Sequence, residues 1–151
     1  MTGNAQDLAS RGKRLGGALL DSLIGLSVTL PILFLTGFFD RLSERQPVSI
    51  AEQGFFFVLG LVLFVVVNGY LLAQYGQTLG KRMVGTRIVS AEHGTLLPFN
   101  RLFILRYALV SLISQIPIAG TIFAITDVLF VFRDDRRCLH DLIAGTVVVD
   151  A

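Results

Sequence analysis

The sequence predicts an all-α membrane protein with two full transmembrane helices, a third apolar segment broken into a helical hairpin, and a small cytoplasmic β element. Of the 151 residues, 53% are hydrophobic and only 16% are charged. Soluble domains carry about 25% charged residues, so this chain has too few charges to cover a globule in water. Its length allows one domain, residues 1–151, whose main partner is the lipid bilayer.

Two apolar runs are long enough to cross the hydrocarbon core of a bilayer, which takes roughly 20 helical residues. The first covers residues 15–39 and contains one ionisable side chain, Asp21. The second covers residues 54–75 and contains no charge. Ser49 and Glu52 fit a capping box, which predicts that the second helix begins just before its apolar run.

The third apolar stretch, residues 102–132, is too long for one straight span, because it would measure about 46 Å at ~1.5 Å per residue. Pro117 and Gly120 interrupt it, and both weaken a helix at that point. We expect two short helices, 102–116 and 118–132, that enter and leave the membrane on the same side. The alternative is three spans, in which 102–115 forms an interfacial helix and 117–133 crosses the membrane.

Lysine and arginine exceed acidic residues in the N-terminal segment and in the connection 76–101, whereas the connection 40–53 is slightly acidic. Short cytoplasmic loops carry such an excess. The N-terminus is therefore expected in the cytoplasm, and the basic segment 133–137 predicts the same for the C-terminus. On that side, residues 83–97 are expected to form a β-hairpin around a turn at 92–94, and residues 145–150 to form a strand.

Polar residues within the apolar segments are costly and usually face protein or water. Asp21, Asn68, Arg106 and Asp127 each lie about 7–10 Å from the cytoplasmic end of their helices at ~1.5 Å per residue, and Arg14 lies two helical turns before Asp21. These five residues are expected to form one buried polar layer. Either they lock the helices together, or one carboxylate stays loosely paired and exchanges a proton or small cation.

Several other classes of function are disfavoured. A net charge of +2 is too small for a nucleic-acid binder. Cys138 is the single cysteine, and no Cys/His cluster has zinc spacing, so neither a disulfide, a metal nor a cofactor is expected. His140 and Asp141 lack an accompanying nucleophile, which favours a hydrogen-bonded pair at a helix start over an acid–base pair. We therefore expect no enzyme.

Three blocks of the chain resemble the RDD family of small prokaryotic integral membrane proteins. They are Arg14–Asp21, the central block 78–89 that contains Gly80 and Lys81, and the block 139–149 that contains Asp141, Gly145 and Thr146. The family is named for one arginine and two aspartates. Arg14 and Asp21 match the first two. The second aspartate is either Asp141, which we take as a surface residue, or Asp127, which we take as buried.

The resemblance implies a multi-pass protein of the prokaryotic plasma (inner) membrane. Some family members are linked to sodium/proton exchange, which implies a cation/proton exchanger, or a subunit of one, with Asp21 and Asp127 as ligands of a sodium ion or proton. A chain of this length is small for a transport pathway, so a homo-oligomer is expected. The alternative is a non-transporting scaffold or accessory protein that recruits a partner.

Overall fold

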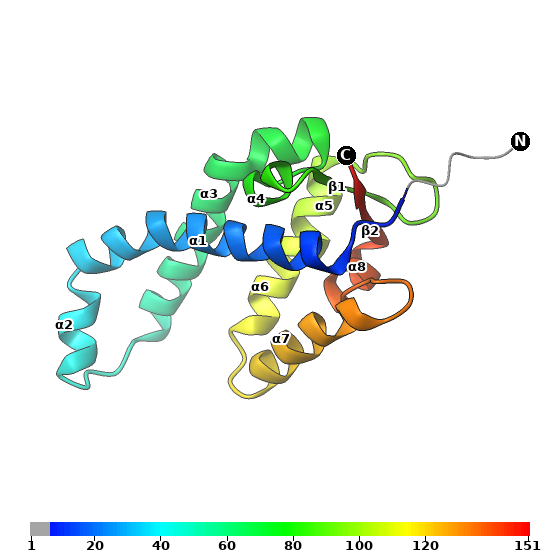
Figure 1. The fold of residues 1–151 in the computed structure, drawn as a ribbon. Coiled ribbons are helices and arrows are strands. Elements are labelled where there is room, and N and C mark those ends of the chain that lie inside the picture. The colour runs from blue at the N-terminus through cyan, green and yellow to red at the C-terminus, as the bar shows by residue number, and fades with distance from the viewer. Residues whose placement is uncertain (1–6) are drawn as a thin grey trace, which may run out of the picture.

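Two long helices dominate the structure, a computed structural model that describes residues 7–151. They are α1 (Arg11–Leu35) and α3 (Ile50–Tyr75), joined through the short helix α2 (Phe38–Ser43) (Figure 1). The predicted capping box is present at the start of α3, where Ser49 and Glu52 bond reciprocally. Both long helices are apolar and long enough to cross a membrane, as the sequence predicted.

The third apolar stretch forms a broken helical hairpin. Its first arm consists of α5 (Phe99–Leu102), the π-helical segment η1 (Phe103–Ala108) and α6 (Leu109–Ser114). Its second arm consists of α7 (Ala119–Leu129) and the 3₁₀ turn η2 (Phe130–Phe132). The break lies at the predicted site. At Gly120 the arms are so close that an added Cβ would lie 2.7 Å from the carbonyl oxygen of Ser114.

The remaining elements are short: α4 (Leu79–Met83), β1 (Thr86–Ser90), α8 (Leu139–Ala144) and β2 (Thr146–Asp150). The predicted strand at 145–150 is present, but the predicted hairpin over 83–97 is wrong. β1 pairs antiparallel with β2, so that Thr86 lies opposite Asp150. The turn at 92–94 does form. The chain after it leads into α5 instead of a second strand, and the valine-rich β2 fills that place.

The best-packed apolar cluster lies at the sheet end of the molecule. It joins the N-terminal segment, the last turns of α3, both strands and α5 through six buried side chains: Ala9, Leu72, Ile88, Leu97, Leu102 and Val148. Leu8 also bridges to Val149 at the free edge of β2. The N-terminal segment, β1, β2 and α8 therefore gather at one end, while α2 lies at the far end of α1 (Figure 1).

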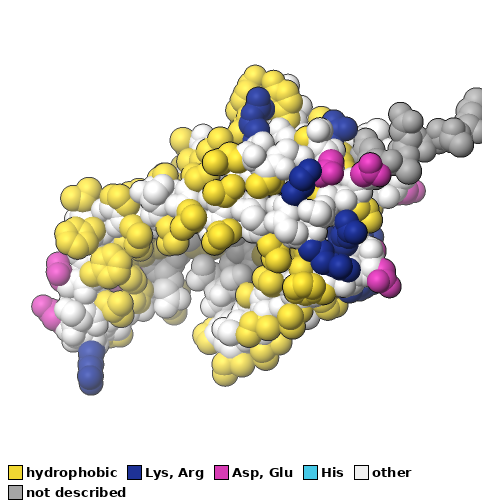
Figure 2. All heavy atoms as spheres, viewed as in Figure 1, with side chains coloured by type: hydrophobic (Ala, Val, Ile, Leu, Met, Phe, Trp, Pro, Cys, Tyr) yellow, Lys and Arg dark blue, Asp and Glu magenta, His cyan; other side chains and the backbone are white. Residues whose placement is uncertain are grey.

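Away from this cluster, the long helices turn apolar faces outward, as the hydrophobic side chains along the molecule in Figure 2 illustrate. Leu19, at 61% exposure, begins a stripe on α1, and Val66, at 75%, lies on a similar stripe of α3. Ile122 on α7 is 60% exposed. The exposed stripes repeat every three or four residues: Leu19, Leu23, Leu26 and Leu30 on α1; Val58, Val62 and Val66 on α3; Ile122, Ile125 and Leu129 on α7. Such continuous apolar surface is unusual for a soluble monomer and typical of a protein that contacts lipid.

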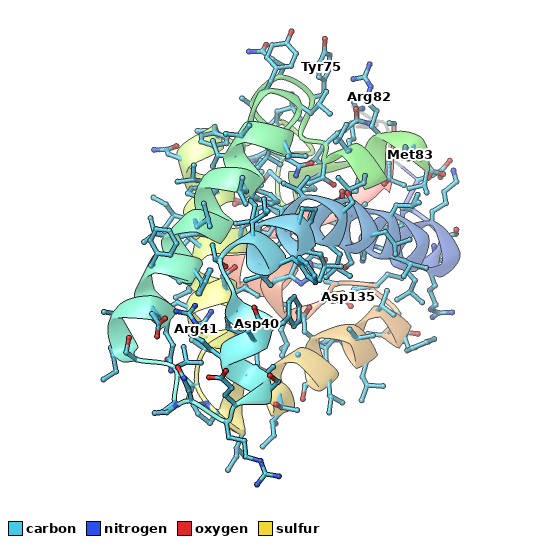
Figure 3. The ribbon with its side chains drawn as sticks, turned by 90° about the vertical axis from the view of Figure 1, so that its left-hand side faces the viewer. Asp40, Arg41, Tyr75, Arg82, Met83 and Asp135 are labelled. Atoms are coloured by element: carbon cyan, nitrogen blue, oxygen red, sulfur yellow. The ribbon has the colours of Figure 1, made fainter. Side chains whose placement is uncertain are left out.

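Polar and aromatic groups mark the two ends of α3; Figure 3 labels Arg41 near one end and Tyr75 and Arg82 at the other. Near its start, Arg41 of α2 forms an ion pair with Glu52, with 2.7 Å between Nη1 and Oε1. At its other end, the guanidinium group of Arg82 lies over the ring of Tyr75, 5.1 Å from its centroid. The apolar length of α3 is thus bounded by charged groups on both sides.

Candidate functional site

Asp141, near the start of α8, is the centre of a buried ionic cluster. Its Oδ2 accepts a hydrogen bond from Nη2 of Arg14 at 2.9 Å, and its Oδ1 accepts one from Nη1 of Arg106. The hydroxyl of Thr146 donates to the same Oδ1 at 3.0 Å. The three charged side chains are at most 5% exposed. We call this cluster, Arg14, Arg106, Asp141 and Thr146, the aspartate clamp.

The clamp connects three segments that are distant in sequence: α1, η1, and α8 with the adjoining strand β2. Asp141 is completely buried, so its assignment to the surface was wrong. Arg14 pairs with this aspartate and not with Asp127. Arg106 projects from the π-helical segment η1, a kind of irregularity often found at functional sites.

The electrostatics of α8 follow from this arrangement. Burial alone would raise the pKa of Asp141, but Arg106, followed by His140 and Arg14, holds it well below its usual range. Burial lowers the pKa of His140, and Arg106 acts in the same direction, so the imidazole is neutral at pH 7. Burial raises the pKa of the Cys138 thiol to about 11, with Asp141 and Asp127 adding to the effect.

Asp21 belongs to a second polar cluster, between α1 and α4. Its Oδ1 accepts a hydrogen bond from the backbone N–H of Gly80 at 2.7 Å. Its Oδ2 accepts one from the hydroxyl of Thr78 at 2.5 Å and lies 3.5 Å from Nζ of Lys81. Asn68 of α3 completes the cluster, because its Oδ1 accepts from the backbone N–H of Leu79 at 2.9 Å. Two side chains from the long helices therefore satisfy the first free N–H groups of α4.

Asp127, on α7, has a corresponding role at α8. Its Oδ1 accepts from the backbone N–H of His140 at 2.8 Å, and its Oδ2 lies 2.7 Å from Nδ1 of the same residue. His140 is therefore hydrogen-bonded to Asp127. The predicted hydrogen bond between His140 and Asp141 is absent, since Nε2 and Oδ2 are 3.9 Å apart.

The polar layer inferred from the sequence is thus divided. Arg14 and Arg106 both pair with Asp141. Asp21 and Asn68 both accept hydrogen bonds from the start of α4. Asp127 pairs with His140. Within residues 7–151, Asp21 forms no ion pair with either arginine. Sequence reasoning missed Thr78 and Cys138 as members of these clusters, although Thr78 opens the family-like block 78–89 and Cys138 directly precedes the block 139–149.

Cavities adjoin both clusters. One of about 430 Å³ lies between α1, α3 and the first arm of the hairpin, and Asp21 is its charged lining residue. Its other polar lining side chains are Ser22, Thr29, Asn68, Tyr107, Ser111 and Gln115. A second cavity, of about 420 Å³, shares Thr29 and Gln115 with it and continues towards α2. A small cavity of about 100 Å³ is lined by Lys81, Arg14, Arg106, Asp127, Cys138 and His140.

Comparisons with known proteins agree with the motif blocks. The protein YckC of Bacillus subtilis is 30% identical over 148 residues, which cover 91% of this chain and 82% of the relative. A Haemophilus influenzae protein is 34% identical over 94 residues, which cover 61% of this chain and 56% of that relative. Both are named as uncharacterized proteins. No solved structure matches the chain. The family model of the RDD family matches residues 8–145, and the chain belongs to this family.

Proposed function

We propose that this chain is an integral membrane protein that exchanges a small cation, sodium being the first candidate, for a proton at Asp21. The observation that carries the proposal is the position of Asp21, whose carboxylate lines the largest of the three cavities described above. An ionisable group in the interior of a membrane protein usually marks an ion or proton pathway.

Neighbouring polar groups suit this role. Hydroxyl and amide oxygens of Ser22, Asn68 and Ser111 line the same cavity, and oxygen is the ligand that hard cations prefer. The connection through Thr29 and Gln115 to the second cavity extends the polar path along α1 and α3. Asp127 is less suited, because it lines the small cavity of about 100 Å³ and not the cavity that Asp21 lines.

Lys81 supplies a mechanism for coupling. Its ammonium group, 3.5 Å from Oδ2 of Asp21, takes the place of a bound cation. A sodium ion that enters from the cavity displaces Lys81 from the carboxylate. Protonation of Asp21 removes the charge that attracts either cation, so the ion leaves when the proton arrives. The carboxylate thus binds a proton or a cation, and not both, as exchange requires.

The exposed apolar stripes leave room for neighbouring copies. A chain of 151 residues is small for a complete alternating-access pathway, so we propose that the exchanging form is a homo-oligomer.

The test is transport by the purified protein in liposomes that contain an internal pH dye. We expect an imposed sodium gradient to change the internal pH, and Asp21→Asn to abolish the change while leaving the protein monodisperse. Asp150→Asn is the matched control, because Asp150 is an exposed carboxylate outside the cavities, and it should exchange normally.

Two results would contradict the proposal: no sodium-dependent pH change with the native protein, or full exchange by Asp21→Asn. The first result together with a co-purifying membrane or cytoplasmic protein would favour the scaffold alternative.

A further inference from the structure

The second arm of the hairpin and the start of α8 bring three different metal-binding side chains together. Ligand atoms of Asp127, Cys138 and His140 all lie within 4.8 Å of one another. Asp127 comes from α7, and the other two residues flank the first residue of α8. We propose that these three side chains bind one zinc ion.

The ligand chemistry favours zinc over the cation of the transport proposal. Thiolate, imidazole and carboxylate are the protein ligands of Zn²⁺, whereas sodium, magnesium and calcium prefer oxygen alone. Three protein ligands are the number in zinc sites that keep a fourth position open. The adjoining cavity of about 100 Å³ has room for a water molecule in that position.

The charges around the three side chains are also compatible with a bound zinc ion. Arg14 and Arg106 lie nearby, but both are paired with Asp141. Neither arginine is therefore paired with Asp127, whose Oδ2 would exchange its contact with Nδ1 of His140 for the zinc ion. One Zn²⁺ with one thiolate and one carboxylate is electrically neutral, so the loaded site presents no net positive charge to the two arginines.

Hydrogen bonds to the backbone hold the ligands in place. The backbone N–H of His140 donates to Oδ1 of Asp127 at 2.8 Å, and that of Cys138 donates to Oδ2 of Asp141 at 3.2 Å. Outer contacts of this kind orient metal ligands. The His140 side chain is 23% exposed and that of Asp127 is 15% exposed, so an ion can reach them from solvent.

Binding has a defined proton balance. In the metal-free protein, Nδ1 of His140 and Oδ2 of Asp127 share a hydrogen bond at 2.7 Å. The neutral imidazole has one proton, and in this bond it lies on Nδ1. When Nδ1 binds zinc, that proton leaves Nδ1 and Nε2 takes one up, so His140 stays neutral and contributes no net release. The Cys138 thiol loses its proton to solvent, so one proton is released for each zinc bound.

The experiment is a titration of the full chain in detergent, without an affinity tag, with Co²⁺ as a spectroscopic probe and then with Zn²⁺. We expect a thiolate-to-cobalt charge-transfer band that saturates at one equivalent, disappears when Zn²⁺ is added, and is absent in Cys138→Ser. Cys138→Ser preserves the backbone contact to Asp141, so this variant should fold.

The two histidines of the chain provide a matched pair. His140→Gln should weaken Zn²⁺ binding by more than the roughly 10–100-fold cost of losing an outer-shell partner. His93→Gln changes an exposed side chain and should bind as the native protein does. No charge-transfer band in the native protein, or equal zinc affinity in folded Cys138→Ser, would overturn the site whatever the outcome of the transport assay.

Discussion

The carboxylate of Asp141 is the most constrained charge in the described part of the chain. It receives hydrogen bonds from two guanidinium groups, a hydroxyl and a backbone N–H, and its side chain is only 1% exposed. A buried charge is tolerated when its partners replace the lost water. Because those partners come from α1, η1 and β2, the clamp holds α1 and η1 against the segment that contains α8 and β2.

Removing this charge should therefore destabilise the whole fold. We expect Asp141→Asn to lower the free energy of unfolding by about 3–5 kcal/mol, because it leaves two buried arginines without their carboxylate. Denaturant unfolding in detergent measures this change. Asp150→Asn is the control, since its ion pair with Lys13 is exposed and such pairs contribute roughly 0–1 kcal/mol. Equal stabilities of the two variants would contradict the role of the clamp.

The lowered pKa of Asp141 determines how the contribution of the clamp to the free energy of unfolding depends on pH. Its ordinary pKa is 3.8, and the folded value is lower. The unfolded chain therefore binds the proton first, and the stabilisation by the clamp is complete above this pH and is lost as the pH falls below it. The difference in stability between the native protein and Asp141→Asn should be constant from about pH 8 to pH 5 and shrink below pH 3.8. Unfolding measurements over this range provide the check, and a difference that shrinks already near neutral pH would disagree with it.

At the scale of elements, the short helices α4 and α8 depend on the long ones. Helices of five or six residues are not stable alone, since nucleation is costly and most of their backbone N–H groups have no partner. Asp21 and Asn68 supply acceptors to α4, and Asp127 supplies one to α8. The polar residues of the apolar segments thus position the segments that adjoin the sheet.

Close contact between α1 and α4 should be sensitive to a single methyl group. At Gly80, an added Cβ would lie 2.7 Å from the backbone nitrogen of Asp21 and would collide with the carbonyl oxygen of Gly17. We expect Gly80→Ala to lower stability by about 1–3 kcal/mol, because the obstacles are backbone atoms that cannot move aside.

Thermal unfolding of Gly80→Ala beside Gly12→Ala tests this prediction. Gly12, in the first turn of α1, has no atom within 4 Å of its added Cβ, so alanine there should cause no loss of stability. Equal effects of the two substitutions would mean that α4 does not pack against α1 as described.

The same elements explain what sequence reasoning could predict. α1 and α3 follow from long apolar runs, and the start of α3 follows from a local capping box. The short helices α4 and α8 have too few residues to show the hydrophobic periodicity of a helix in the sequence. The strand partner of β1 and the partner of Arg14 could not be found locally, because Arg14 and Asp141 are 127 residues apart. The family-like blocks contain Arg14, Asp21 and Asp141 but neither Arg106 nor Asp127. Only the fold reveals that Asp21 and Asp141 belong to different clusters.

At the scale of the whole molecule, the sheet joins the two ends of the chain. The backbone N–H of Ala9 donates to the carbonyl of Val148 at 3.2 Å, and Lys13 pairs with Asp150 at 3.0 Å. The connection between α3 and α5 contributes β1 to the same structure. If the long helices cross a membrane, the N-terminal segment, this connection and the C-terminal strand must therefore lie on one side of it.

Charge indicates which side that is. Apart from Arg41, Arg45 and the buried Arg106, the lysines and arginines lie in the segments at the sheet end or in the first turn of α1: Arg11, Lys13, Arg14, Lys81, Arg82, Arg87, Arg101, Arg133, Arg136 and Arg137. An excess of this kind favours the cytoplasm. We therefore predict that both termini are cytoplasmic and that the loop between α2 and α3 faces the opposite side.

Single cysteines introduced into Cys138→Ser test this topology in intact cells with a membrane-impermeant maleimide. Gln46→Cys, between α2 and α3, should react in intact cells, whereas Glu92→Cys, in the exposed turn after β1, should react only after the membrane is permeabilised. A cysteine added after Ala151 must show the same labelling pattern as Glu92→Cys, because β1 and β2 belong to one sheet and therefore lie on one side of the membrane. Labelling of the added C-terminal cysteine, but not of Glu92→Cys, in intact cells would mean that the segment 99–132 crosses the membrane once. In that case Arg106 and Asp141 could not meet, and the clamp itself would be excluded.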